Sequence, residues 1–307
     1  MDLKANKVLL IVLKLSISSS LLYLVLSRTG LDKVIGILKK MSLPAFTSAV
    51  LLYIFAQLIS TLRWKLFLPE EHGTRKLFSL YMIGSFFNIF LPGVIGGDAV
   101  KGYYLYQSTG NATLSLASIF MDRYVGFVAL ISICAVAFPF GYLYFAGSRL
   151  AWLLPLIVVS FIAASLLIFG LRIGQRMRFI SEFYTSFHAY RNQKGVIGKT
   201  FMLSVLVQFA GISAVYLLAL GLGQHIPFLA FLIFLPLIIL FTTIPISISG
   251  LGVRESATVI LFGLVGIRPE VATAISLSWF ISMSAGSLIG LIEYLRYKKE
   301  IIHLEAK

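Results

Sequence analysis

The sequence has few charged residues, a single cysteine and no grouping that is typical of a catalytic or metal site. Asp, Glu, Lys and Arg make up only 12% of its 307 residues, about half of the ~25% that soluble domains carry. Cys134 cannot form an internal disulfide, and its place in an apolar run indicates a packing role. The histidines are scattered without metal-ligand spacing, and no Ser-His-Asp or Cys-His grouping is readable. These absences argue against a soluble enzyme.

The sequence also lacks a complete nucleotide-binding motif. "GVIGKT" at Gly195–Thr200 resembles the end of a P-loop, but Gln193 stands where the first glycine should be, and no strand precedes it. The formal net charge of +14 would fit nucleic acid in a soluble protein. In so apolar a chain it is typical of basic loops that face an anionic membrane surface. We therefore expect no cofactor, no metal and no nucleic-acid partner.

Long apolar runs are what the sequence has in abundance. Hydrophobic residues make up 59% of the chain, and the mean hydropathy is +0.94. A helix needs about 20 apolar residues to cross a bilayer. Runs of this kind predict an all-α polytopic membrane protein with about six full spans: Val8–Leu26, Pro44–Leu62, Leu114–Ala135, Ala151–Leu171, Thr200–Leu222 and Ala272–Leu295. The first run is longer than a signal peptide core and no cleavage site follows it, so we interpret it as a retained helix.

Two further apolar segments are interrupted by proline and glycine. The first reads "LPGVIGGDAVKGY" and the second "TIPISISGLGVRES". Proline ends a helix, and glycine adopts dihedral angles that other residues avoid. Non-helical backbone inside a membrane must be shielded by protein or line a wet cavity. We therefore predict two re-entrant broken-helix segments, with tips at Pro92–Asp98 and Pro245–Gly252.

The two interrupted segments also repeat one another. Pro92 and Pro245 are 153 residues apart, and a basic residue follows each of them after nine residues. The same shift lays the second predicted span on the fifth and the third on the last. The sequence therefore predicts one membrane domain, 1–307, that contains pseudo-repeats at about 8–146 and 151–297. Three full spans, an odd number, lie between the two interrupted segments, so the two halves have opposite orientation, as in many secondary transporters.

The basic residues give the orientation in the membrane. The segment Arg172–Lys199 lies within the second pseudo-repeat, is rich in Lys and Arg, and is expected in the cytoplasm together with both chain termini. Arg28–Lys40 is basic yet falls outside, and its apolar pattern predicts a short amphipathic helix on the surface. Arg63, Trp64 and Lys65 are interpreted as an interfacial anchor.

Charged residues at the two breaks and inside the third span are candidate substrate ligands. Charge within a span is costly, is usually paired and marks function. Helices that start at Gly97 and Gly250 would aim backbone N–H groups and a positive dipole end into a cavity, which suits phosphate. We therefore expect substrate binding, and no catalysis, by residues of the breaks and of "FMDRYVGF": Gly96, Gly97, Asp98, Lys101, Asp122, Arg123, Gly250, Gly252, Arg254 and Glu255.

A structural role is the alternative for the same residues. Glycines also permit close packing between membrane helices. Asp122 and Arg123 can form a mutual or near-neighbour ion pair that holds helices together, or Arg123 can extend to the interface. The sequence leaves these alternatives open, and it predicts two further pairs, Asp98 with Lys101 and Arg254 with Glu255.

Three stretches resemble the signature regions of the lysylphosphatidylglycerol synthase transmembrane, or flippase-like, family: "LPGVIGGDAVKGYYLY", "MDRYVGF" and "IPISISGLGVRES". The resemblance covers nearly the whole chain. It implies a membrane region that moves a lipid between leaflets; in the best-known members this region is fused to a cytosolic domain that transfers lysine from lysyl-tRNA to phosphatidylglycerol. Lys307 follows the last span by twelve residues, so we expect a stand-alone member without the transferase. Two departures are mild: Ser249 stands where the family often has proline, and Asp122 where it often has Glu.

These observations favour a lipid flippase or scramblase that moves a phospholipid or lipid-linked head group between leaflets through a central cavity. The basic residues of the three motifs would bind phosphate. The acidic residues would pair with them when the site is empty, or meet a cationic head group. Expected partners are anionic or zwitterionic phospholipids, or polyprenyl-linked lipids. A homo-oligomer and a separate lipid-modifying enzyme stay open as partners.

Two other functions also stay open. One is the membrane component of lysylphosphatidylglycerol synthesis, working with a separate transferase; no metal-binding carboxylate cluster supports catalysis by the chain itself. The other is a small-solute secondary transporter, which can share the inverted plan. In each case we expect an integral protein of the plasma (cytoplasmic) membrane of a prokaryote.

Overall fold

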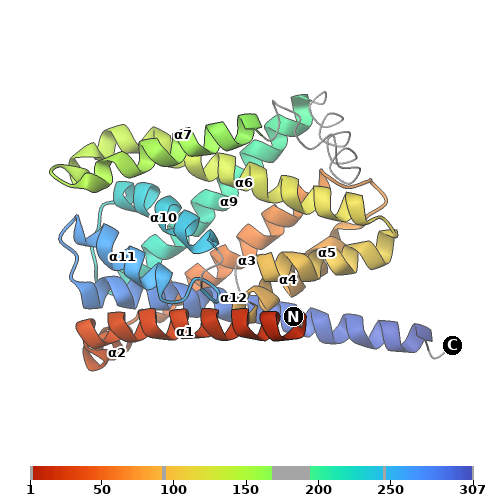
Figure 1. Ribbon diagram of the computed structural model, residues 1–307, viewed down its shortest axis with the longest axis horizontal. Helices are drawn as coiled ribbons and strands as arrows, with labels where there is room; N and C mark the ends of the chain where they lie inside the picture. Colours follow the sequence, from red (N-terminus) through yellow and green to blue (C-terminus); the bar gives the residue numbers. More distant parts are fainter. Residues whose placement is uncertain (1–2, 92–94, 168–193, 245–246, 306–307) are drawn as a thin grey trace.

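The protein is an all-α polytopic membrane protein, as the apolar runs predict (Figure 1). The computed structural model describes residues 3–91, 95–167, 194–244 and 247–305. The segment predicted to be cytoplasmic lies largely outside the described residues. The described helices are α1 (Leu3–Thr29), α2 (Leu31–Leu38), α3 (Leu43–Lys65), α4 (Thr74–Phe90), α5 (Ile95–Thr109), α6 (Ala112–Gly141), the short η1 (Tyr142–Phe145) and η2 (Arg149–Trp152), α7 (Leu153–Ser165), α9 (Lys194–Gly221), α10 (Phe228–Thr243), α11 (Val253–Gly263) and α12 (Pro269–Glu305).

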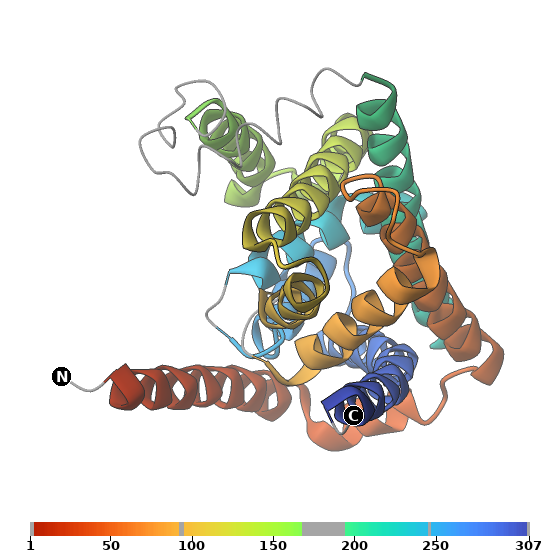
Figure 2. The same ribbon diagram turned by 90° about the vertical axis from the view of Figure 1, so that its right-hand side faces the viewer.

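Five stretches of the described residues are long and apolar enough to cross a membrane: Leu43–Lys65, Ala112–Phe145, Arg149–Leu167, Gly195–Gly221 and Pro269–Tyr297. Each overlaps one of the predicted spans. The first predicted span lies within α1, which is helical over 27 residues but is not among the five. α1 runs along one side of the bundle, and its N-terminal end projects away from the other helices (Figure 2). The short helix expected after it is present as α2.

The two interrupted segments form helix pairs that are too short to cross a bilayer singly. α4 and α5 have 17 and 15 residues, and α10 and α11 have 16 and 11. At 1.5 Å per residue, all four are shorter than the ~30 Å apolar core of a membrane. Within each pair the two helices pack against each other. Pro92 and Pro245 lie outside the described residues, and re-entry from opposite faces stays a prediction.

The helices form two sets that share one order and one pattern of packing partners. The order of α3, α4, α5 and α6 returns as α9, α10, α11 and α12. α3 packs against α9; α4 packs against α12, and α10 correspondingly against α6; α5 packs against α6, and α11 against α12. This pattern is unchanged when the two sets are exchanged, as expected when two copies of one unit pack face to face. The boundaries of the pseudo-repeats and the opposite orientation of the halves stay predictions.

The apolar core is concentrated where α10 and α11 meet α6, α9 and α12. Phe231, Phe234 and Phe262 are fully buried there and pack edge to face. Cys134 is buried in the same core, and its thiol donates a weak hydrogen bond to the Ile233 carbonyl. A packing role for this cysteine agrees with the sequence. The core holds the second helix pair rigidly against the long helices and so positions its polar tip.

Candidate functional site

A cavity lined by charged and polar side chains together with apolar ones lies between the two sets of helices. Its volume is about 310 Å³, and its wall is built from α3, α4, α5, α6, α9, α10, α11 and α12. Five of the ten predicted site residues line it, and they come from all three motifs: Asp98, Lys101, Asp122, Arg123 and Arg254. The tertiary structure therefore brings the motifs to one place, although they are far apart in the chain.

Lys101 lies at the centre of the charges from the first half. Asp98 and Lys101 are three residues apart on α5, so one helix face carries both. The Lys101 Nζ lies 3.6 Å from Asp98 Oδ1 and 3.5 Å from Asp122 Oδ2. It also lies 4.1 Å from the ring centroid of Tyr81 and 4.5 Å from that of Trp64. The predicted pair of Asp98 and Lys101 is confirmed, and two rings add cation–π attraction.

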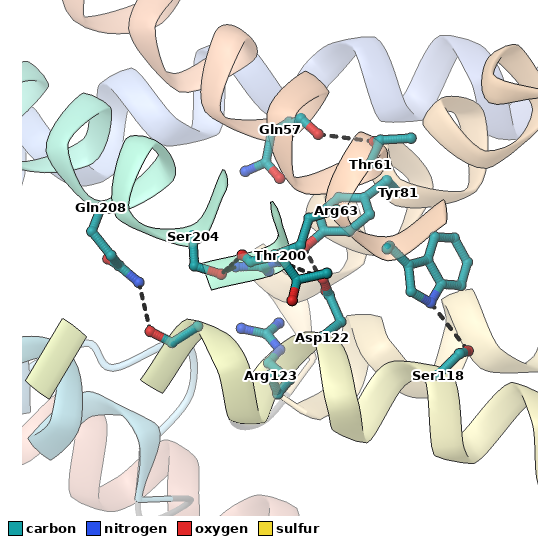
Figure 3. Close-up of polar contacts among 12 residues, drawn as sticks. Gln57, Thr61, Arg63, Tyr81, Ser118, Asp122, Arg123, Thr200, Ser204 and Gln208 are labelled. Carbon is teal, nitrogen blue, oxygen red and sulfur yellow. Dashed lines mark hydrogen bonds and ion pairs between the residues drawn. The ribbon is translucent and has the colours of Figure 1, made fainter. Parts of the chain in front are cut away.

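Asp122 is fully buried and does not pair with its neighbour Arg123. Its Oδ1 lies 2.8 Å from Arg63 Nε, and the Tyr81 hydroxyl donates a hydrogen bond of 2.9 Å to its Oδ2 (Figure 3). Arg123 instead donates from Nε to Asp98 Oδ2. Consecutive residues of a helix point about 100° apart, so the two side chains meet different helices. The mutual pair that the sequence left open is not formed.

The interpretation of Arg63 and Trp64 as an interfacial anchor is wrong. Arg63 is 4% exposed and Trp64 is fully buried. Besides Asp122, Arg63 contacts α9, where its Nη1 donates to Ser204 Oγ over 2.9 Å (Figure 3). The Trp64 indole N–H donates to Ser118 Oγ over 3.1 Å. The sequence did hold a signal for Arg63: a carboxylate within a span requires a cation partner.

Arg254 and Glu255 form the predicted pair in the second half. Arg254 Nη2 lies 2.9 Å from Glu255 Oε1, which also accepts from Ser276 Oγ over 2.9 Å. Glu255 Oε2 accepts the Gly252 N–H over 2.6 Å, so its carboxylate caps the helix that carries it. Glu255 is fully buried and does not line the cavity, whereas Arg254 does, beside the ring of Phe280.

The glycines of the first break make close packing possible. A Cβ added at Gly97 would overlap the carbonyl oxygen of Gly84, and one added at Gly96 would overlap the Leu91 side chain. The Gly97 N–H donates to Asn88 Oδ1 over 2.8 Å. α5 begins at Ile95, so the predicted helix start at Gly97 is wrong, and the Gly97 N–H has a partner within the protein. Contact of these glycines with a substrate stays a prediction.

The second break is a turn with left-handed backbone. Gly250 has a φ of 74° and Gly252 a φ of 81°, angles that glycine adopts without strain. Ser249 has a φ of 51°, which proline cannot adopt. α11 begins only at Val253, so the predicted helix start at Gly250 is also wrong. The turn is held against α1, where Ser18 Oγ accepts the Ile248 N–H over 2.9 Å.

Four basic and two acidic side chains line the cavity, and they favour binding of an anion: Arg63, Lys101, Arg123 and Arg254 against Asp98 and Asp122. Within the ranges that the structure describes, no group of three or more His, Cys, Asp or Glu side chains could hold a metal ion. Amide and hydroxyl groups complete the polar wall, among them Gln57, Asn88 and Ser284. Such a wall can hold a charged head group by ion pairs and hydrogen bonds.

Comparison with known proteins gives one family and several archaeal relatives. The family model described as the lysylphosphatidylglycerol synthase TM region matches residues 11–290. A UPF0104 membrane protein of Pyrococcus horikoshii is 24% identical over 324 residues, covering 93% of this chain and 97% of the relative. UPF0104 membrane proteins of Methanocaldococcus jannaschii and Methanothermobacter thermautotrophicus are each 25% identical, covering 94% and 78% of this chain and 95% and 80% of their own length.

Proposed function

Because the chain belongs to the family of lysylphosphatidylglycerol synthase transmembrane regions, we propose that it is a lipid flippase or scramblase. Its head-group site is the cavity lined by the charged residues, and its substrate is a lipid with a phosphate-containing head group. The acyl chains remain in the bilayer beside the bundle. A plasma-membrane location with cytoplasmic termini, a homo-oligomer and a separate lipid-modifying enzyme stay parts of the proposal that need their own tests.

The observation that carries this proposal is a cavity lined by charge inside a bundle whose outer surface is apolar. Apolar side chains such as Leu51, Leu156 and Leu206 on the membrane-spanning helices are largely exposed, as expected of surfaces in contact with lipid. The cavity-lining cations lie in α3, α5, α6 and α11. Charges at such positions are costly, and in membrane proteins they mark substrate paths. A lipid has the same two-part character, with a charged head and apolar tails.

Movement between leaflets follows from the two helix pairs. If the α4–α5 and α10–α11 pairs enter from opposite faces, each tip closes the cavity from one side. Opening of one pair at a time would then expose the head-group site to one leaflet and afterwards to the other. The acidic residues neutralise all but one of the cations when no head group is bound, which lowers the cost of the buried charge.

We expect purified protein in proteoliposomes to exchange a fluorescent phospholipid between leaflets. The phosphatidylglycerol carries a fluorescent dye on one acyl chain. Added dithionite quenches the fluorescence by reducing the dye, and it reaches only the dye in the outer leaflet. Protein-free vesicles should lose about half of the fluorescence, and vesicles with protein nearly all of it. Arg254→Gln should lower the rate at least about tenfold, because a hydrogen-bonded charged contact contributes roughly 1.5–3 kcal/mol. The matched control is Arg149→Gln, since Arg149 is exposed and does not line the cavity.

The same assay separates the other functions. A small-solute transporter would leave lipid exchange at the protein-free rate while moving solute into the vesicles. A component of lipid synthesis would need a transferase and would show no exchange alone. If lipid exchange were equally fast in Arg254→Gln and in the wild type, the proposal that the head group passes through the cavity would be rejected.

We expect cysteine labelling to show that both short helix pairs return to the side from which they enter. In a Cys134→Ala background, Glu71→Cys and Ser108→Cys flank the first pair, and His225→Cys and Arg268→Cys flank the second. Each pair of cysteines should react with a membrane-impermeant maleimide from one side only, and the two pairs from opposite sides. Lys40→Cys and Glu71→Cys flank the full span α3 and provide the control, because they should react from opposite sides. If the two cysteines that flank one helix pair reacted from opposite sides of the membrane, that helix pair would cross the membrane completely.

A further inference from the structure

The cavity has a charge balance that points to one class of head group, and the inference rests on the proposed function. We propose that the site selects lipids whose head group carries one net negative charge and no ammonium group. Its phosphate is held by Arg123 and Arg254, and its remaining polar part consists of hydroxyl groups. The substrate class is therefore a phosphodiester lipid with a neutral polyol head, such as phosphatidylglycerol.

Every oxygen of the carboxylates at the cavity already faces a cation of the protein. Each oxygen of Asp98 faces a cation, Oδ1 that of Lys101 and Oδ2 that of Arg123. Asp122 is contacted by Arg63 at Oδ1, and by Lys101 and the Tyr81 hydroxyl at Oδ2. An incoming ammonium would have to share one of these oxygens with a protein cation and would be repelled by that cation. Binding of an ammonium head group is therefore disfavoured.

Glu255 is occupied in the same way. Its Oε1 accepts from Arg254 and Ser276, and its Oε2 accepts the backbone N–H of Gly252. It also lies behind the cavity wall, fully buried. Its role is to hold Arg254 in place and to cap α11, and a head group cannot reach it.

The arginines, by contrast, keep unused donors. Arg123 donates from Nε to Asp98, and neither of its Nη nitrogens has a hydrogen bond to any residue that the structure describes. Its side chain is 36% exposed, compared with 2% for Lys101 and 5% for Arg63. Arg254 uses Nε and Nη2, and its Nη1 has no such hydrogen bond within the described ranges. A guanidinium group with free N–H donors grips a phosphate oxygen well.

The total charge agrees with this assignment. The four cations of the wall face three carboxylates, Asp98, Asp122 and the enclosed Glu255, which leaves one positive charge. A phosphodiester carries one negative charge and would bring the sum to zero. A zwitterionic head group would leave the excess in place, and a lysylated head group would increase it. In surroundings of low dielectric constant, uncompensated charge is costly, so the site favours the anion.

A neutral polar wall completes the site. Ser284 Oγ is buried, lines the cavity and has no hydrogen-bond partner among the described residues. Gln57 from α3 and Asn88 from α4 line the same cavity. A buried hydroxyl without a partner is uncommon and calls for one. Head-group hydroxyls can both donate to such groups and accept from them, which an ammonium group cannot do because it only donates.

Competition between lipids for the purified protein tests the inference directly. Native mass spectrometry is recorded in detergent with equimolar phosphatidylglycerol, phosphatidylethanolamine and lysyl-phosphatidylglycerol of identical acyl chains. Phosphatidylglycerol should occupy the protein at least about tenfold more than either competitor, the effect expected of one unmatched charged contact. Equal occupancy of the three lipids, or preference for an ammonium head group, would overturn the inference.

Variants then locate the selectivity. Arg123→Gln brings the site to zero net charge and leaves Asp98 paired with Lys101, so the protein should fold while its preference for phosphatidylglycerol over phosphatidylethanolamine falls toward one. Arg149→Gln removes a cation outside the cavity and should keep the full preference. Ser284→Ala should weaken phosphatidylglycerol binding relative to a phosphatidic acid methyl ester, which has the same charge but no hydroxyl group. An unchanged preference in Arg123→Gln would contradict the role of this residue.

The outcomes distinguish the inference from the proposed function. Fast exchange of all head groups in proteoliposomes, together with unselective binding, would leave a scramblase and reject the selectivity. Selective binding without exchange of any lipid would keep the anion site and reject the flippase.

Discussion

Asp122→Asn is expected to lower the free energy of unfolding by about 3–5 kcal/mol, the cost of breaking a buried ion pair, and to abolish lipid exchange. Asp122 is fully buried, and among the described residues its carboxylate is the sole acidic partner of Arg63 and one of two acidic partners of Lys101. Its loss leaves two positive charges in excess at the cavity. The asparagine amide retains the shape but cannot neutralise them. Unfolding in mixed micelles, followed by tryptophan fluorescence, measures the effect.

A compensating variant and a surface control make this prediction specific. Arg63→Gln combined with Asp122→Asn restores the original net charge, so the double variant should be more stable than Asp122→Asn alone. Glu270→Gln removes a carboxylate whose partner Arg268 is 73% exposed, and such a surface pair contributes at most about 1 kcal/mol. A double variant that is as unstable as the sum of its two single variants would show that charge balance is not what Asp122 supplies.

Gly97→Ala is expected to separate α4 from α5 and to remove most folded protein. The added methyl group would overlap the backbone carbonyl of Gly84, and backbone cannot rotate away as a side chain can. Overpacking typically costs 1–3 kcal/mol where side chains can shift, so about 3 kcal/mol or more is expected here. Displacement of α5 also moves Asp98 and Lys101, so exchange should fall together with stability.

Two other glycines give the graded comparison. A Cβ at Gly84 would lie 2.8 Å from the Gly97 carbonyl oxygen, so Gly84→Ala should be harmful as well, but less so than Gly97→Ala. Gly211 on α9 has nothing within 4 Å of an added Cβ, and alanine is the better helix former by about 1 kcal/mol. Gly211→Ala should therefore keep full stability. The yield of monodisperse protein and the midpoint of thermal unfolding rank the three variants by stability. A Gly97→Ala variant as stable as Gly211→Ala would contradict the close approach of α5 to α4 at Gly97.

Agreement between sequence and structure is best where the information is local. Hydropathy along a run depends only on neighbouring residues, and five predicted spans coincide with long apolar helices. Proline and glycine act on their own backbone, so the two breaks fall where the motifs lie. Arg254 and Glu255 are adjacent in the chain and do pair as predicted, but the equally adjacent Asp122 and Arg123 do not, so adjacency alone does not determine pairing.

The sequence by itself therefore determined the membrane class, the approximate positions of the long helices and of the breaks, and most of the charged residues that lie within the bundle. Only the tertiary structure decided which charges of different helices meet. Asp122 pairs with Arg63 from another helix, while the adjacent Arg123 turns to Asp98. Neighbours on a helix diverge by about 100°, so the choice of partner depends on which helices pack together. For the same reason Arg63, which lies at the end of an apolar run, is buried and forms an ion pair with Asp122.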